Sequence, residues 1–193
     1  MVSAMADPKE TLVRYLQGAR EAVLWKLEGL SEYDARRPLT PTGTNLLGLV
    51  KHLASVELGY FGDTFDRPSG IDLPWYSEAA DINADMWLTP DQSREWVVDL
   101  YHRAWAHAAQ TFAACELDTV GHVPHWDGEA VTLHQILVHV ATETHRHAGH
   151  ADILREMVDG AAGFLTNASN LPGDGYDWEA HVAEVEAAAA TFR

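Results

Sequence analysis

The sequence of 193 residues predicts an all-α protein, a four-helix bundle followed by one additional C-terminal helix. Two observations predict this fold class: apolar residues recur at helical spacing over four long segments, and helix-capping signals stand at the starts of three of them. Between them we find no convincing strand. We expect a single domain over residues 1–193, with the bundle at about 8–160 and a tail and last helix at 161–193.

The first helix is predicted from a capping box at its start. Asp7 suits the N-cap, Pro8 the first helical position and Glu10 the closing position of the box. Apolar side chains then recur at helical spacing to about residue 30. They are Leu12, Tyr15, Leu16, Ala19, Val23, Leu27 and Leu30.

The second helix is predicted over about Leu46–Phe65, after a loop at residues 36–45 that carries two prolines and a glycine. Its apolar stripe contains Leu46, Leu49, Leu53, Val56 and Tyr60. Residues 66–88 are predicted to be irregular, because prolines and a glycine interrupt them. The aromatic side chains of this segment, Trp75, Tyr76 and Trp87, are expected to pack onto the bundle more readily than to wall a substrate pocket.

The remaining helices also follow capping signals. "TPDQ" at residues 89–92 predicts a third helix that reaches about Ala114, and "TLHQ" at residues 132–135 predicts a fourth that ends at Asp159. Gly160 then suits the position after the helix. The first and third connections are short enough for antiparallel neighbours, whereas the middle one can cross over. The alanine-rich last helix, within residues 177–193, either covers the bundle or mediates a homodimer.

The composition argues against two classes of partner. The chain has 29 acidic and 13 basic residues, a formal charge of −16, so it repels the phosphates of nucleic acids and the anionic surface of membranes. No stretch approaches the roughly 20 apolar residues of a membrane span. The N-terminus lacks the features of a signal peptide, so we expect a cytoplasmic protein. One cysteine, Cys115, permits neither an intrachain disulfide nor a thiolate cluster.

The fourth helix carries the strongest chemical signal, four histidines and a glutamate within residues 139–150. At about 100° per residue, His147 falls within the apolar stripe of this helix and Glu143 at its edge. Residues four apart stand about 5–6 Å between Cβ atoms, so both side chains can converge on one ion. Metal sites in bundle cores take ligands from facing helices. His52 is the best third ligand, because it borders the apolar stripe of the second helix.

The structural alternatives stay open at this point. A single histidine on an apolar face is more often a hydrogen-bonded core residue than a metal ligand. Glu143 and His147 could also form an intrahelical hydrogen bond. A buried glutamate without a cation is costly, which favours a metal ion.

The other histidines of the fourth helix divide into two groups. His139 and His150 lie further from the ligand face and are candidates for the surroundings of the site. His134 and His145 fall on the opposite side, where we expect solvent or a partner. Just before this helix, "HVPHW" at residues 122–126 either overhangs the site or is an ordinary connection.

Two segments resemble a known superfamily over most of the chain. "RPLTPTGTNLLGLVKHLASVELGYFGDTF" and, far downstream, "ETHRHAGHADILREMVDG" are similar to the DinB-like superfamily, and more narrowly to its actinobacterial mycothiol S-transferase branch. The resemblance implies a four-helix bundle with an up-down-down-up course. It also implies a divalent metal held by one histidine of the second helix and an (i, i+4) pair on the last bundle helix.

On this chain, "HAGH" places the second member of that pair at His147, which puts the first at Glu143 and the ligand of the second helix at His52. Many superfamily members have histidine where this chain has Glu143. The glutamate leaves the site less positive and leaves the identity of the metal open. Zn²⁺ is the expected ion because two histidines and a glutamate with open positions match a catalytic zinc site, and Ni²⁺, Fe²⁺ and Mn²⁺ are the alternatives.

A metal ion lowers the pKa of a bound water or a bound thiol. Cys115 is predicted at the end of the third helix, away from the ligand helices, so we expect an external thiol, and the resemblance implies mycothiol. The leading hypothesis is a metal-dependent S-transferase in which a metal-bound thiolate attacks an electrophilic small molecule. The alternatives are a metal-dependent hydrolase or isomerase at the same site, and a non-catalytic metal-binding stress protein in which His139 and His150 join the site.

Overall fold

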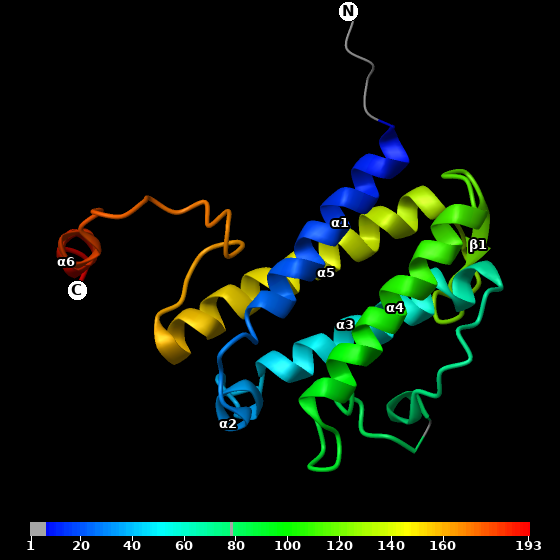
Figure 1. Cartoon of the computed structure of the whole chain (residues 1–193), viewed down its shortest axis with the longest axis horizontal. Helices are drawn as coiled ribbons and strands as arrows, with labels where there is room; N and C mark the ends of the chain where they lie inside the picture. Colours follow the sequence, from blue (N-terminus) through cyan, green and yellow to red (C-terminus); the bar gives the residue numbers. More distant parts are fainter. Residues whose placement is uncertain (1–6, 78) are drawn as a thin grey trace, which may run out of the picture.

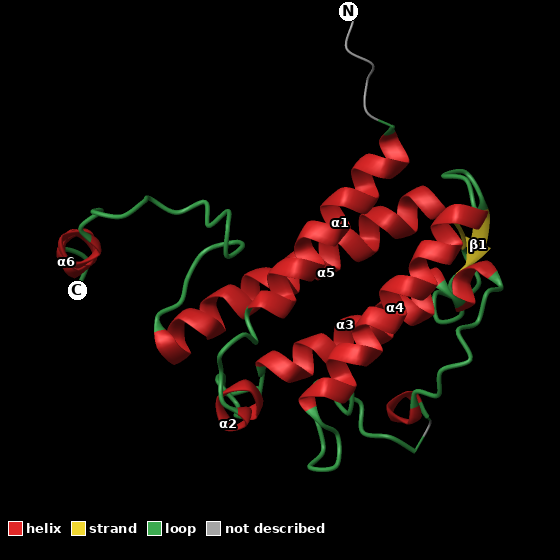
Figure 2. Cartoon of the chain, viewed as in Figure 1, coloured by secondary structure: helices red, strands yellow, loops and turns green. Residues whose placement is uncertain are grey.

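The computed structural model describes residues 7–77 and 79–193, and these form the predicted helical bundle (Figures 1 and 2). The first six residues, which bear on the signal-peptide prediction, lie outside the described residues. The helices are α1 Pro8–Trp25, α2 Glu32–Arg36, α3 Leu46–Phe61, α4 Arg94–Ala114, α5 Leu133–Asp159 and α6 Trp178–Ala190, with 3₁₀ turns at Asp63–Phe65 and Pro74–Tyr76. Two short strands, β1 Val120–His122 and β2 Ala130–Thr132, form an antiparallel hairpin.

The four long helices follow the up-down-down-up course. In Figure 1, α1 and α5 run in one direction and lie side by side, while α3 and α4 run in the opposite direction. α3 packs against both α4 and α5. The long connection of residues 62–93 returns the chain to the other end of the bundle, so that α3 and α4 are parallel. None of the described helices is long and apolar enough to cross a membrane.

Three of the predicted helix ends are confirmed. Asp7 caps α1 by accepting a hydrogen bond from the backbone of Glu10. Thr132 caps α5, and Gly160 ends it in the left-handed conformation, with φ of 79°, that glycine adopts at low cost.

The predicted start of α4 is wrong. The helix begins at Arg94, and the hydroxyl of Ser93 caps it. The "TPDQ" segment at residues 89–92 forms a turn instead, closed by a bond from the Gln92 amide to the Thr89 carbonyl. The Gln92 side chain accepts from the backbone of Thr89, as in a capping box, and also from Lys51. Gln92 therefore makes the bond that closes a capping box and also contacts Lys51 on α3, but the helix itself begins only at Arg94.

Two other boundaries differ from the prediction. The first helix ends at Trp25 rather than near residue 30, and Gly29, with φ of 73°, leads into the short helix α2, which was not predicted. α3 ends at Phe61, and the chain continues as a 3₁₀ turn to Phe65. The hairpin of β1 and β2 was also not predicted, because strands of three residues are too short to show an alternating pattern.

The C-terminal helix does not cover the bundle. Figure 1 shows α6 apart from the four long helices, and every residue of α6 is exposed. Of the two roles predicted for this helix, the homodimer therefore stays a prediction.

Candidate metal centre

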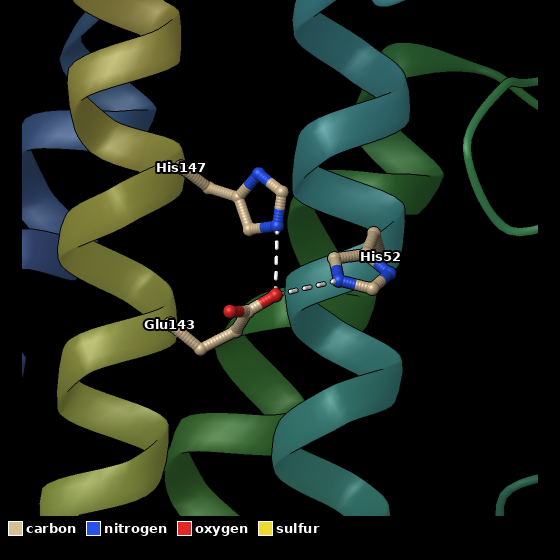
Figure 3. Close-up of side chains that lie close together, drawn as sticks. All are labelled: His52, Glu143 and His147. Carbon is tan, nitrogen blue, oxygen red and sulfur yellow. Dashed lines mark hydrogen bonds and ion pairs between the residues drawn. The ribbon is translucent and has the colours of Figure 1, made fainter.

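The structure brings together the three residues predicted as ligands. His52 extends from α3, and Glu143 and His147 extend from α5 toward it (Figure 3). One ligand atom from each residue lies within 4.8 Å of the others. Oε1 of Glu143 is 2.9 Å from Nε2 of His147 and 3.5 Å from Nε2 of His52. The Nε2 atoms of both histidines therefore converge on one carboxylate oxygen.

The helical phase predicted for α5 is confirmed. His147 is buried among the apolar side chains, whereas the side chain of Glu143 keeps 26% of its exposure at the edge of the core. His134 and His145 are exposed on the other side of the helix. The His145 ring bonds to the backbone carbonyl of Ala141 rather than to the site. The site therefore lies at the border of the core, where solvent can reach it.

An aspartate that the sequence analysis missed orients His52. Nδ1 of His52 donates a hydrogen bond to Oδ2 of Asp85 at 2.7 Å, and the hydroxyl of Tyr76 donates to the same oxygen at 3.4 Å. With its Nδ1 proton held by this carboxylate, His52 turns its Nε2 atom toward Glu143. A carboxylate behind a histidine is the usual arrangement around metal ligands, because it fixes both the ring and its tautomer.

α3 itself places Asp85 against His52. The backbone oxygen of Met86 approaches Gly48 so closely that a Cβ atom there would stand 1.8 Å from it. The buried Lys51 donates to the carbonyls of Ala84 and Trp87, at 2.7 and 3.0 Å. These contacts hold residues 84–87 on the surface of α3. A glycine and a lysine inside an apolar helix were the available signal for this close approach.

The predicted packing of the aromatic connection is borne out at Trp75. This side chain is buried, and its indole nitrogen donates to the hydroxyl of Ser55 on α3 at 2.9 Å. Tyr76, its neighbour, reaches Asp85 behind the site. The exposed Trp87 does not share this role. Residues 74–76 are thus a second anchor that holds the long connection against α3.

The charges of the site favour a bound cation. Burial alone would raise the pKa of Glu143, but the two neighbouring imidazoles outweigh it and hold this pKa below its usual value. Burial lowers the pKa of His147, and the charge of His52 lowers it further. Near neutral pH these two residues are a carboxylate and a neutral imidazole, the forms that bind metal.

His52 differs in its protonation. Burial alone would lower its pKa, but the hydrogen bond and charge of Asp85, together with Glu143, raise it above the usual value. Because a metal ligand must be a neutral imidazole, protons compete with an ion for His52 more strongly than for a histidine of ordinary pKa.

The two outer histidines of α5 take separate positions around the site. Nδ1 of His150 lies 3.2 Å from Nδ1 of His147, so His150 supports the ring of a ligand. On the other side of Glu143, His139 packs against Tyr60 and Trp126, with ring centroids 4.8 and 4.9 Å apart.

The "HVPHW" connection reaches this neighbourhood. Nε2 of His125 and the hydroxyl of Tyr60 are 3.2 Å apart, and the ring of Trp126 lies against that of Tyr60. Of the two readings of residues 122–126, the structure supports the one in which they extend over helix faces next to the site. We call Tyr60, His125, Trp126 and His139 the aromatic cluster.

The donor set fits a divalent metal. Two imidazole nitrogens and one carboxylate oxygen are ligands that zinc and other first-row metals accept, and the carboxylate offsets part of the charge of the ion. Among the described residues, the group of possible ligands contains only these three side chains. His139 and His150 are neighbours of the group and not members of it.

Comparison with known proteins gives a family and a fold. The model of the family described as mycothiol-S-transferase matches residues 11–160, a range that includes all three site residues. The crystal structure of a conserved protein from Enterococcus faecalis is similar to this chain with a TM-score of 0.59 and 18% sequence identity, over 81% of this chain and 99% of that one. At this identity the likeness shows the fold alone. No curated protein matches the chain.

Proposed function

Because the chain belongs to the mycothiol S-transferase family, we propose that it joins mycothiol, or a similar low-molecular-weight thiol, to an electrophilic small molecule at the site of His52, Glu143 and His147. The observation that carries this proposal is the convergence of two imidazole nitrogens and a carboxylate oxygen from two facing helices. We propose that the protein acts in the cytoplasm, where small thiols are kept reduced.

The three residues would hold a divalent ion, and Zn²⁺ is the first candidate because its preferred ligands match the set. When bound, such an ion acts as a Lewis acid that lowers the pKa of a thiol and so favours the nucleophilic thiolate. Asp85 keeps the Nδ1 proton on His52 and leaves its Nε2 atom free to bind. His150 supports the ring of His147 in the same way.

The chain itself offers no accessible sulfur nucleophile. Its one cysteine, Cys115, follows the last residue of α4 and is buried, with 9% of its surface exposed. An external thiol is therefore the source of sulfur in the proposed reaction. In that reaction a carbon–sulfur bond forms at the electrophilic carbon, the leaving group departs with its electron pair, and the thiol proton passes to solvent.

The ligand geometry also bears on the metal-sequestering alternative. A sequestering protein would gain from His139 and His150 as further ligands. His139, however, packs against Tyr60, and His150 contacts His147. A hydrolase or isomerase would use the same three ligands, so only the reaction separates it from a transferase.

The test combines metal analysis with turnover. The purified protein, loaded with Zn²⁺, is incubated with mycothiol and a chlorobimane, a reagent that becomes fluorescent when it alkylates the thiol sulfur and loses chloride. We expect one ion per chain and product formation above the uncatalysed rate that requires both the thiol and the ion. Several ions per chain without turnover would overturn the proposal in favour of sequestration. Consumption of the electrophile without thiol would favour hydrolysis.

A further inference from the structure

A pocket of about 370 Å³ lies between the C-terminal half of α5 and the loop that precedes α3. We call it the threonine pocket. Leu154 forms a buried part of its wall, and Ile153 and Met157 border it with 61% and 65% of their surfaces exposed. The remaining lining residues are Thr40, Thr42, Thr44 and His150. Its volume is within the range of small-molecule sites.

The pocket lies next to the metal centre, and His150 stands between them. His150 lines the pocket and is also in contact with His147, with 3.2 Å between their Nδ1 atoms. On α5, His147, His150, Leu154 and Met157 follow one another at intervals of three or four residues, so they lie along one face of the helix. A small molecule in the pocket therefore extends along this face from the site of the proposed reaction.

The wall formed by the loop is preorganised and offers few free polar groups. The hydroxyls of Thr40 and Thr42 lie 3.1 Å apart and bond to each other. The Thr40 hydroxyl also accepts from the backbone of Thr44, and the Gly43 amide donates to the Thr40 carbonyl. Because the loop satisfies these groups internally, the pocket presents methyl groups and aliphatic side chains to a ligand.

The aromatic cluster, on the other side of Glu143, has the opposite chemistry. It carries the imidazoles of His125 and His139 beside aromatic faces; the Tyr60 hydroxyl bonds to Nε2 of His125, which leaves the second nitrogen of that ring for a ligand. A thiol rich in hydroxyl groups needs many hydrogen-bond partners, and the threonine pocket offers few beyond the Thr44 hydroxyl and the His150 imidazole. Two neighbourhoods of different polarity thus flank the metal centre. This arrangement suits a reaction between a polar thiol and an apolar electrophile.

We propose that the threonine pocket binds the apolar part of the electrophilic substrate, an alkyl or aryl group linked to the reacting carbon directly or through a short spacer. This inference rests on the proposed function and adds the substrate class. Ile153 and Met157 are exposed apolar side chains that a bound alkyl group would cover.

N-alkyl iodoacetamides test this proposal, because the reactive group stays constant while the alkyl chain grows from methyl to octyl. The sulfur of mycothiol attacks the carbon that bears iodine, the carbon–iodine bond breaks, iodide leaves and the thiol proton passes to solvent. The buried Cys115 protects the protein itself from this reagent, which mass spectrometry can verify. Rates are corrected for the uncatalysed reaction.

In the zinc-loaded protein we expect kcat/KM to rise about threefold to fourfold per methylene until the pocket is full. Met157→Asp should flatten this dependence, because a carboxylate at the rim opposes burial of an alkyl chain. Met157→Leu, of similar volume, should keep it. Val138→Asp is the matched control: it adds the same charge at another exposed apolar position of α5, and the dependence should remain.

The outcomes separate the two proposals. Metal content is measured for each variant, so that damage to the metal centre is distinguished from loss of the pocket. Turnover without dependence on chain length, or an unchanged dependence in Met157→Asp, would overturn the threonine pocket as the alkyl site while the proposed function stands. No thiol-dependent product with any member of the series would overturn the proposed function and this inference with it.

Discussion

Two polar clusters lie against α3, and they differ in where their positive charge comes from. Glu57 is fully buried and meets the guanidinium of Arg20, with contacts of 2.8 and 2.5 Å. In the other cluster, the carboxylate of Glu143 meets the imidazoles of His52 and His147, and its side chain keeps 26% of its exposure. The first cluster carries its cation within the chain, between α1 and α3. The second offers ligand atoms and solvent access.

The difference separates a structural ion pair from a binding site. A permanent guanidinium compensates the charge of Glu57, so this carboxylate needs nothing from outside. The permanent cation beside Glu143 is Arg146, 4.0 Å away and 66% exposed, and solvent screens a contact of this kind. The two imidazoles are cations only when they are protonated. We infer that a cation from solution has most to gain at the second cluster.

The largest effect is expected when a ligand is removed. His147→Ala should abolish stoichiometric binding of Zn²⁺, because two donors on different helices remain. Metal content per chain after dialysis measures this loss, and circular dichroism verifies that the bundle is folded. His145→Ala is the matched control two residues away, since its side chain is exposed and bonds to its own helix. A full ion in His147→Ala would disprove the site.

The next largest effect is expected when the buried ion pair of Arg20 and Glu57 is broken. Glu57→Ala should lower the free energy of unfolding by about 3–5 kcal/mol, because it leaves the buried guanidinium of Arg20 without a carboxylate to balance its charge. Denaturant titration of the zinc-free protein gives this value. Glu21→Ala, which removes an exposed carboxylate of α1, should have an effect within about 0.5 kcal/mol. Replacing Arg20 and Glu57 together by leucine should recover much of the loss. A small effect of Glu57→Ala would remove the contrast between the clusters.

Chelation should have an intermediate effect, confined to the second cluster. An ion that links α3 and α5 stabilises the folded state by about 2.7 kcal/mol at a free concentration one hundred times its Kd. Its removal should lower Tm by roughly 5–10 °C in a protein of this size. Calorimetry with and without a chelator measures the shift, and His147→Ala should show none. An equal shift in that variant would place the chelated ion elsewhere.

The predictability of the two clusters from sequence also differs. Glu143 and His147 lie on one helix, so their spacing and the apolar phase of α5 were enough to predict that they point together. His52 followed from its place beside the apolar stripe of α3. The pair of Arg20 and Glu57 was not predicted, because an amphipathic pattern assigns charged residues to the exposed face of a helix, and both of these residues are buried.

α3 shows why that pattern was incomplete. The stripe was predicted to include Val56 and Tyr60, which are only half-buried, whereas Lys51 and Glu57 are buried. α3 packs against α4 and α5 and is also covered by residues 84–87, so little of its circumference meets solvent. A helix surrounded in this way has no single apolar face from which to read its contacts.

Asp85 marks the limit of sequence analysis at the metal centre. It is one of 29 acidic residues, and it lies in an irregular connection 33 positions from His52. Its place is set by contacts of Gly48 and Lys51 with the backbone around it. These two residues indicate that some segment approaches α3, but they do not identify which one. The smallest predicted effect concerns Asp85, because it acts on the metal through His52.

Asp85→Asn should weaken Zn²⁺ binding by about 10- to 100-fold, since the amide orients the His52 ring less strongly than the carboxylate. The zinc affinities of wild type and variant should be compared near pH 8. In the wild type Asp85 raises the pKa of His52, so at lower pH protons compete with the ion for this ring. NMR titration of the metal-free variant should accordingly give a lower pKa for His52 than in the wild type. Asp81→Asn is the isosteric control, an exposed residue of the same connection. Equal zinc affinity in both variants would show that His52 needs no carboxylate behind it.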